Sequence, residues 1–246
     1  MRDNKLFIVG IGPGNMGGMS QAAYKILKEV DVIVGYKIYL NLISDLIKEK
    51  QETYHSGMRQ EKERAEKAIE LAKKGKKVAI ISSGDSGVYG MAGLVFELID
   101  KKEYGLEVEV VSGITAANAA AAVLGAPLMH DYAVISLSDL LTPWKQIKKR
   151  LKNAAKADFI TVLYNPRSSK RTEQIKYAQK IFLEYQKNDT PVGIVRSVGR
   201  KGEKKVIAEL SNMLTEKIDM LSTVIIGNSE TYVSKGRMIT PRGYNL

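Results

Sequence analysis

The sequence predicts an α/β protein of two domains, one with a mainly parallel sheet and one with a mixed sheet. Short apolar runs alternate with amphipathic stretches, a pattern typical of strands covered on both faces by helices. After Ser112-Gly113 comes a run of small residues, and then the alternation begins again. Towards the C-terminal end, successive strands lie too close together for a crossover helix between every pair, which favours a mixed second sheet. We therefore expect an N-terminal domain over 1–112 and a C-terminal domain over 113–246.

In the first domain, continuous apolar runs predict buried strands. They lie at 6–9, 31–34, 78–81 and 108–111. Ser20 is a suitable N-cap for the helix that follows it. A second helix is expected over 60–74 and should end at Gly75, because glycine readily takes the left-handed conformation after a helix. Apolar residues at helical spacing predict a third helix over 91–98.

In the second domain, strands are expected at 132–137, 159–164, 192–195, 206–208 and 223–226. The small residues of 115–122 predict a closely packed helix or a connector between the domains. Thr142-Pro143 is expected to open another helix, since proline is tolerated in the first helical turn. Helical spacing between Ile175 and Tyr185 predicts one more.

Composition excludes several classes of protein. The chain has no cysteine and two histidines, which argues against disulfides, thiol nucleophiles and a protein-held metal site. No apolar run reaches the roughly 18 residues of a membrane span, and no signal peptide is evident, so we expect a cytoplasmic protein without membrane contact. The net charge of +11 fits either a polyanionic partner or a surface rich in solvated lysine.

Two glycine-rich loops follow predicted strands. The first, residues 10–15, reads GIGPGN, with Asn15 where a dinucleotide-binding GxGxxG loop needs glycine. The second strand leads to Gly35-Tyr36 and not to the acid that holds a nucleotide ribose, so a nicotinamide site is disfavoured. The second loop, residues 82–90, reads SSGDSGVYG and combines backbone donors and acceptors with one carboxylate. That combination suits a cationic sulfonium with an amino-acid tail better than a phosphate, although Asp85 could instead cap the next helix.

From this loop onward the sequence resembles the tetrapyrrole methylase superfamily. Within it, the chain is similar to the precorrin-3B / cobalt-factor III C-17 methyltransferases, the ring-contraction enzymes of cobalamin biosynthesis within porphyrin metabolism. The segments that carry the resemblance are VGIGPG (9–14), VGYKIYL (34–40), GMRQEKERAEKAIELA (57–72), SSGDSGVYGMAGL (82–94), SGITAANAAAAVLGAPLMHDYAVISLSDLLTPW (112–144), LYNPRSSKR (163–171) and TVIIGN (223–228).

The resemblance implies a homodimer in which S-adenosyl-L-methionine binds in a cleft between the domains and leaves as S-adenosylhomocysteine. Carried over by position, the cofactor-binding residues are Pro13, Gly84, Asp85, Val88, Thr115, Ala116, Tyr164, Thr223 and Gly227. Asn15 departs from the family, since many relatives have aspartate there. The substrate is a small tetrapyrrole, and any cobalt arrives inside the macrocycle.

Methyl transfer from a sulfonium needs no acid catalyst, but the ring contraction implied by the resemblance needs a base. The candidates lie around one predicted strand. His130, before it, has the more suitable intrinsic pKa, whereas Asp139 with Ser138, after it, is the rival. For the several carboxylates of the substrate, bidentate pairing favours arginines of the matching segments, namely Arg59, Arg167, Arg171 and Arg196.

Three alternatives remain. A sister tetrapyrrole methylase would modify another ring carbon, and an enzyme of the same fold that methylates ribosomal RNA ribose would suit the positive charge. A basic RNA-binding module is of another class. It should interleave aromatic residues on a basic face, whereas aromatics form only 7% of this chain and are scattered. We therefore expect no nucleic-acid partner.

Overall fold

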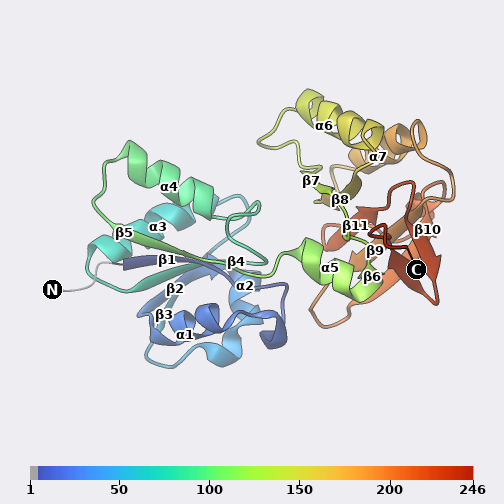
Figure 1. Ribbon diagram of the computed structural model, residues 1–246. Helices are drawn as coiled ribbons and strands as arrows, with labels where there is room; N and C mark the ends of the chain where they lie inside the picture. The colour runs from blue at the N-terminus through green and yellow to red at the C-terminus, as the bar shows by residue number, and fades with distance from the viewer. Residues whose placement is uncertain (1–4, 246) are drawn as a thin grey trace. The chain divides into compact units, whose positions relative to one another are not determined.

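The computed structural model describes residues 5–245, which form two compact units divided between Thr115 and Ala116. The sequence placed this division between residues 112 and 113. Figure 1 shows a sheet with helices on both faces in each unit. Among residues 5–245, no helix is both long enough and apolar enough to span a membrane.

The sheet of the first unit has five strands in the order β3-β2-β4-β1-β5, and every pair is parallel. The strands are β1 (Lys5–Gly10), β2 (Val32–Tyr36), β3 (Glu52–Ser56), β4 (Val78–Ser82) and β5 (Glu107–Val111). The expected parallel sheet is confirmed. The edge strand β3 was not expected, because its residues are polar and largely exposed, so it has no apolar run.

Helices cover both faces of this sheet, because side chains of successive strand residues point to opposite faces. The helices are α1 (Gln21–Glu29), α2 (Lys37–Leu42), α3 (Glu61–Lys73) and α4 (Ala92–Lys101). Leu6 and Ile8 of β1 pack with α3 and α4, whereas Val9 packs with α1 and α2. Ser20 caps α1 as predicted, since its hydroxyl accepts the backbone N–H of Ala23 at 3.2 Å.

The second unit holds a five-stranded sheet of order β10-β9-β11-β8-β7, in which only β7 and β8 run parallel. Its strands are β7 (Tyr132–Ser136), β8 (Ile160–Tyr164), β9 (Pro191–Arg196), β10 (Lys204–Glu209) and β11 (Ser222–Ile226). The mixed sheet expected from the short connections is confirmed. A small sheet of order β12-β13-β6 adds β6 (Gly125–Ala126), β12 (Tyr232–Ser234) and β13 (Arg237–Ile239).

Three helices cover this larger sheet. They are α5 (Ala116–Leu124), α6 (Trp144–Lys156) and α7 (Glu173–Leu183). Helix α5, made largely of alanine, packs on one face, while α6 and α7 pack on the other. The small residues of α5 therefore form a helix, which was one of two expectations. Pro143 occupies the N-cap of α6 and not its first turn.

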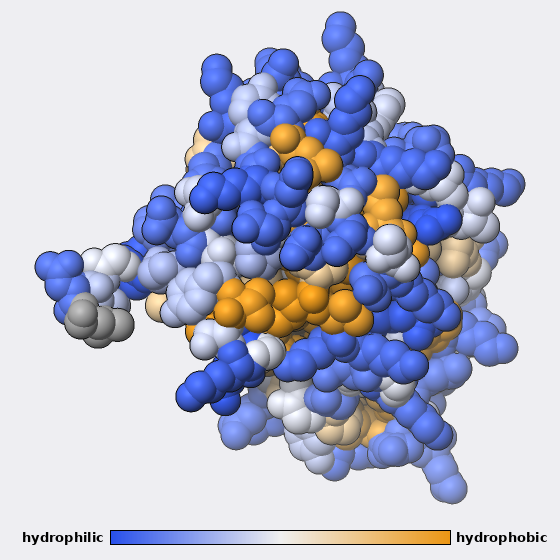
Figure 2. All heavy atoms as spheres, turned by 90° about the vertical axis from the view of Figure 1, so that its right-hand side faces the viewer, coloured by the Kyte–Doolittle hydropathy of each residue, from blue (hydrophilic) through white to orange (hydrophobic). Residues whose placement is uncertain are grey.

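The surface carries many charged and polar side chains. On the face drawn in Figure 2, hydrophilic residues surround smaller apolar patches. Several lysines pair with glutamates, such as Lys5 with Glu107 at 2.8 Å and with Glu109 at 2.9 Å. These carboxylates raise the pKa of the Lys5 ammonium above its ordinary value of 10.5.

Candidate functional site

The loops after β1 and β4 are joined by hydrogen bonds. The backbone N–H of Gly12 donates to the carbonyl of Gly84 at 3.0 Å, and the N–H of Gly84 donates back to the carbonyl of Gly12 at 2.7 Å. Both glycines have positive φ, 77° and 70°, which other residues adopt at a cost. The two glycine-rich loops of the sequence thus form one structure at the carboxyl edge of the parallel sheet, where open α/β sheets bind ligands.

The segment after β5 belongs to the same structure. Gly113 lies so close to its neighbours that a Cβ atom there would approach the Gly84 carbonyl oxygen to 2.1 Å and that of Gly10 to 2.7 Å. The carboxylate of Asp85 links the loops: one oxygen accepts the N–H of Gly87 at 2.8 Å, and the other accepts the N–H of Gly113 at 2.8 Å. Asp85 does not cap α4, whose N-cap is Met91.

Apolar side chains are exposed around this edge. They come from all three loops: Met16 (40% exposed), Val88 (37%), Tyr89 (59%) and Ile114 (43%). Pro13 of the first loop is buried, and Asn15 caps the 3-10 helix η1 (Met16–Gly18) by accepting the N–H of Gly18 at 2.8 Å. Thr115, the last residue of the first unit, is half-buried. This edge therefore combines exposed apolar groups, backbone polar groups and one carboxylate. Such a combination suits a ligand that has both apolar and polar parts.

In the second unit, polar residues meet where β7 and β8 end. Ser136 and Tyr164 are register partners at these ends. Asn165, which follows β8 with φ of 50°, donates from its amide to the hydroxyl of Ser136 at 3.0 Å. The hydroxyl of Tyr164 accepts the N–H of Ala117 in the first turn of α5 at 2.8 Å. Ala116 opens that helix, so Tyr164 and Ala116, both expected to bind the cofactor, lie close together.

The two ends of β7 separate the candidate bases. His130 precedes the strand and is exposed, whereas Ser138 and Asp139 follow its other end. Five strand residues at about 3.3 Å each lie between them. The N–H of Ser138 donates to the hydroxyl of Ser136 at 3.2 Å, and a carboxylate oxygen of Asp139 accepts from the amide of Gln174 at 3.0 Å. Ser138 and Asp139 therefore share the edge with Tyr164, and His130 does not.

Strand β11 separates Thr223 from Gly227 in the same way. Thr223 lies at the start of β11, and its neighbour Val224 pairs with Leu163, so Thr223 is on the Tyr164 edge. Gly227 lies beyond the other end, where its N–H donates to the carbonyl of Pro191 at 2.9 Å. Thr223 and Gly227, both expected to bind the cofactor, therefore lie at opposite ends of β11.

The four predicted substrate arginines differ in environment. Arg59 is exposed and has φ of 66°, and Arg167 is exposed on the loop after β8. Arg171 is only 8% exposed; its guanidinium donates to the carbonyl of Asn165 at 2.9 Å and contacts the sulfur of Met220 at 3.3 Å.

Arg196 at the end of β9 pairs with Asp219, its Nε lying 2.6 Å from a carboxylate oxygen. Partial burial acts to raise the pKa of the Asp219 carboxyl. The hydrogen bonds from Arg196 and from the N–H of Leu221 outweigh it, so the pKa lies below its ordinary value of 3.8.

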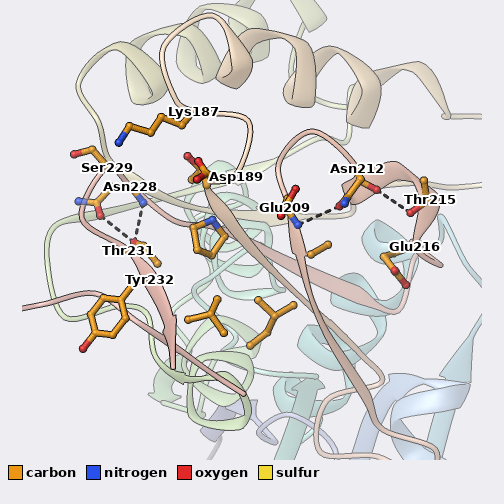
Figure 3. A pocket seen from close by; sticks show the side chains of 15 residues that line it. Lys187, Asp189, Glu209, Asn212, Thr215, Glu216, Asn228, Ser229, Thr231 and Tyr232 are labelled. Atoms are coloured by element: carbon orange, nitrogen blue, oxygen red, sulfur yellow. Dashed lines mark hydrogen bonds between the residues drawn. The ribbon is translucent and has the colours of Figure 1, made fainter. Parts of the chain in front are cut away.

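A pocket of about 660 Å³ lies away from these residues. Figure 3 shows that its lining includes Lys187, Asp189, Glu209 and Tyr232. Asn228 and Ser229, which also line it, follow Gly227 and so lie at the opposite edge of the sheet from Tyr164. We place no function there, because among the described side chains that line it no buried polar group lacks a partner.

Comparison with known proteins agrees with the architecture of both units. Residues 5–214 match the family model of tetrapyrrole (corrin/porphyrin) methylases. The chain belongs to the tetrapyrrole methylase family. This methylase is 50% identical over 244 residues to the cobalt-factor III methyltransferase of Priestia megaterium, covering 98% of this chain and 45% of that protein.

It is 49% identical to the probable cobalt-factor III C(17)-methyltransferase of Salmonella typhimurium, covering 98% of this chain and 100% of that protein. Among solved structures, the methyltransferase CobJ superposes with a TM-score of 0.91 at 35% identity, covering 96% and 99% of the two chains. The tetrapyrrole methylase fold predicted from the sequence is confirmed.

Sequence patterns missed three polar residues of this methylase that shape the site. Asn165 orients Ser136, Gln174 holds Asp139, and Asp219 pairs with Arg196. The only available signal was the position of Asn165 immediately after a predicted strand. Gln174 and Asp219 contact residues 35 and 23 positions away, which no local pattern indicates.

Proposed function

We propose that the protein transfers a methyl group from S-adenosyl-L-methionine to C-17 of cobalt-factor III and promotes contraction of the macrocycle. The proposal rests chiefly on the identity of 50% to a cobalt-factor III methyltransferase over nearly the whole of this chain. The match spans less than half of that relative, but it spans all of the Salmonella protein. Methyl transfer and contraction leave the product at the oxidation level of the factor. Cobalt-precorrin-4, the product expected from the resemblance, forms from it on two-electron reduction by an external reductant.

We assign the methyl donor to the joined loops of the first unit. Backbone groups around Gly12 and Gly84 can approach a ligand closely, since neither residue has a side chain in the way. Val88 and Tyr89 offer apolar surface for an adenine, and the carboxylate of Asp85 favours a cation. When bound, the sulfonium supplies an electrophilic methyl whose leaving group departs as a neutral thioether.

The protein then contributes alignment more than acid–base catalysis. Holding a nucleophilic carbon in line with the methyl is worth up to about 7–11 kcal/mol in ideal cases. For ring contraction, the polar edge of the second unit offers Asp139 and Ser138 beside Tyr164. We propose Asp139 as the group that accepts a proton, because His130 lies at the far end of β7.

Two exposed valines provide a matched test of the donor site. Val88, in the loop after β4, and Val206, on β10, are each 37% exposed, so arginine can replace either without disturbing the core. We expect Val88→Arg to abolish S-adenosylmethionine binding measured by calorimetry, and Val206→Arg to leave it unchanged. Equal binding by both variants would contradict the assignment.

The reaction is tested by incubating the wild-type protein and S-adenosylmethionine with cobalt-factor III and, separately, with precorrin-3B, and measuring product mass and optical spectrum. A product heavier by one methyl group with the spectrum of a contracted ring supports the proposal. Absence of methylation, or methylation of metal-free precorrin-3B alone, rejects it. From the same resemblance we propose a homodimer acting in the cytoplasm, which sedimentation and cell fractionation can test.

A further inference from the structure

The loop after β8 bears an open pocket of about 460 Å³. Its lining comes from two segments of the second unit: Arg167, Ser168, Ser169, Thr172, Ile218, Asp219, Met220 and Leu221. One wall is basic and hydroxylic, and the other is mainly apolar. A carboxylate on a short methylene chain combines the same two chemistries, because its head accepts hydrogen bonds and its stem is apolar.

Charge balance distinguishes the arginines around this pocket. The carboxylate of Asp219 is already satisfied, because Arg196 donates to one oxygen and the N–H of Leu221 donates to the other at 2.9 Å. Arg196 and Asp219 thus neutralise each other. Glu173, beside the pocket, pairs with Lys176 at 2.8 Å.

Arg171 lies behind the pocket wall without an acidic partner among residues 5–245. It is 8% exposed, its Nε has no hydrogen-bond partner, and its other contacts are the carbonyl of Asn165 and the sulfur of Met220. A buried cation is costly unless a negative charge compensates it, and that cost falls when an anion binds nearby. The pocket therefore has an unbalanced positive charge behind its wall and exposed Arg167 at its mouth.

We propose that this pocket binds one carboxylate side chain of the tetrapyrrole, an inference that rests on the function proposed above. Arg167 and the hydroxyls of Ser168 and Ser169 bind the carboxylate, and Met220 and Leu221 cover its methylene stem. Arg171 is a positioning residue: it fixes the loop through the carbonyl of Asn165 and adds positive potential. Arg196, whose charge is matched by Asp219, takes no part in binding.

The hydrogen bonds within the loop after β8 give Arg167 and Arg171 different roles. The loop closes on itself, because the N–H of Ser168 donates to the carbonyl of Arg171 at 3.0 Å and the N–H of Arg171 donates to the hydroxyl of Ser168 at 3.1 Å. Fixing Arg171 thereby fixes Ser168 and the neighbouring Arg167. Of these two arginines, only Arg167 touches the ligand.

The test measures steady-state methylation of cobalt-factor III by the wild type and by Arg167→Gln, Arg171→Met and the double variant. Loss of a charge-assisted hydrogen bond corresponds to about a tenfold or greater rise in KM for the macrocycle. We expect that rise for each single variant, with kcat and the Kd for S-adenosylmethionine nearly unchanged. Because both residues act on the same carboxylate, the factor by which KM rises in the double variant should be smaller than the product of the factors for the two single variants.

Lys149→Gln removes the same charge from an exposed position on α6 and serves as the control. Its KM should match the wild type, and equal melting temperatures would show that all variants fold. A KM unchanged in Arg167→Gln, or raised equally in Lys149→Gln, overturns the carboxylate site while leaving the proposed function standing. If the wild type does not methylate cobalt-factor III, the proposed function fails and the inference fails with it.

Discussion

Asp85 shows how one residue can join loops that are distant in sequence. Its two carboxylate oxygens accept the N–H groups of Gly87 and Gly113. In Asp85→Asn, one oxygen becomes an NH2 group that faces an N–H donor, and loss of one hydrogen bond between half-buried groups costs about 0.5–1.5 kcal/mol. We expect a melting temperature lower by about 2–4 °C for each kcal/mol lost, together with weaker S-adenosylmethionine binding. Asp100→Asn, at an exposed position whose side chain makes no hydrogen bond to the described residues, is the control. Equal melting temperatures in the two variants would refute the linking role.

Asp219 gives a pH-dependent prediction at the same scale. Its folded-state pKa lies below the ordinary value, so its pairing with Arg196 stabilises the fold above about pH 4 and is lost as the pH falls through the lowered pKa. We expect the melting temperature of the wild type to fall more steeply below about pH 4 than that of Asp219→Asn. Parallel curves for the two proteins would show that the pair does not stabilise the fold.

The sequence indicated individual candidate residues but not the contacts that they make. It indicated Asp85 as a cofactor residue or a helix cap, but its partner Gly113 is 28 residues away. It offered His130 and Asp139, nine positions apart at the two ends of one predicted strand, as rival bases. An extended strand keeps such residues apart, whereas a turn would bring them together.

At the scale of elements, α5 packs tightly on the second sheet through Gly193 of β9. A Cβ atom at Gly193 would lie 2.3 Å from one methyl of Leu124, so this fully buried side chain would have to shift within the packed core. Overpacking a buried position costs about 1–3 kcal/mol. We expect Gly193→Ala to lower the free energy of unfolding by that amount, measured by urea denaturation. Gly93→Ala is the matched control, because a Cβ atom added at Gly93 would meet no neighbouring atom within 4 Å. Replacing glycine by alanine should also stabilise the helix α4 by up to about 1 kcal/mol. A Gly193→Ala protein as stable as the wild type would mean that α5 can shift on the sheet.

Most elements that the sequence predicted have a buried face, although the predicted edge strand β10 has no buried residue. Strands such as β4 and β11, buried along their whole length, appear as continuous apolar runs. The polar edge strand β3 lacks that signal, and β6 has only two residues. Pairing with a neighbouring strand creates both, and local composition does not encode that pairing.

At the scale of the whole molecule, the net charge of +11 should act on the two substrates differently. The proposed acceptor bears several carboxylates, so it is attracted by the excess of lysine and arginine, whereas the proposed methyl donor carries both signs of charge. Raising the salt concentration from about 0.1 M to about 1 M shortens the screening length from about 10 Å to about 3 Å. We expect KM for cobalt-factor III to rise over this range and Kd for S-adenosylmethionine to change little.

Performing the titration with both NaCl and potassium glutamate distinguishes screening from specific chloride binding, since only specific binding should depend on the anion. A KM independent of salt would indicate that the surface charge is solvated without attracting substrate, and that recognition depends on short-range contacts such as those of Arg167.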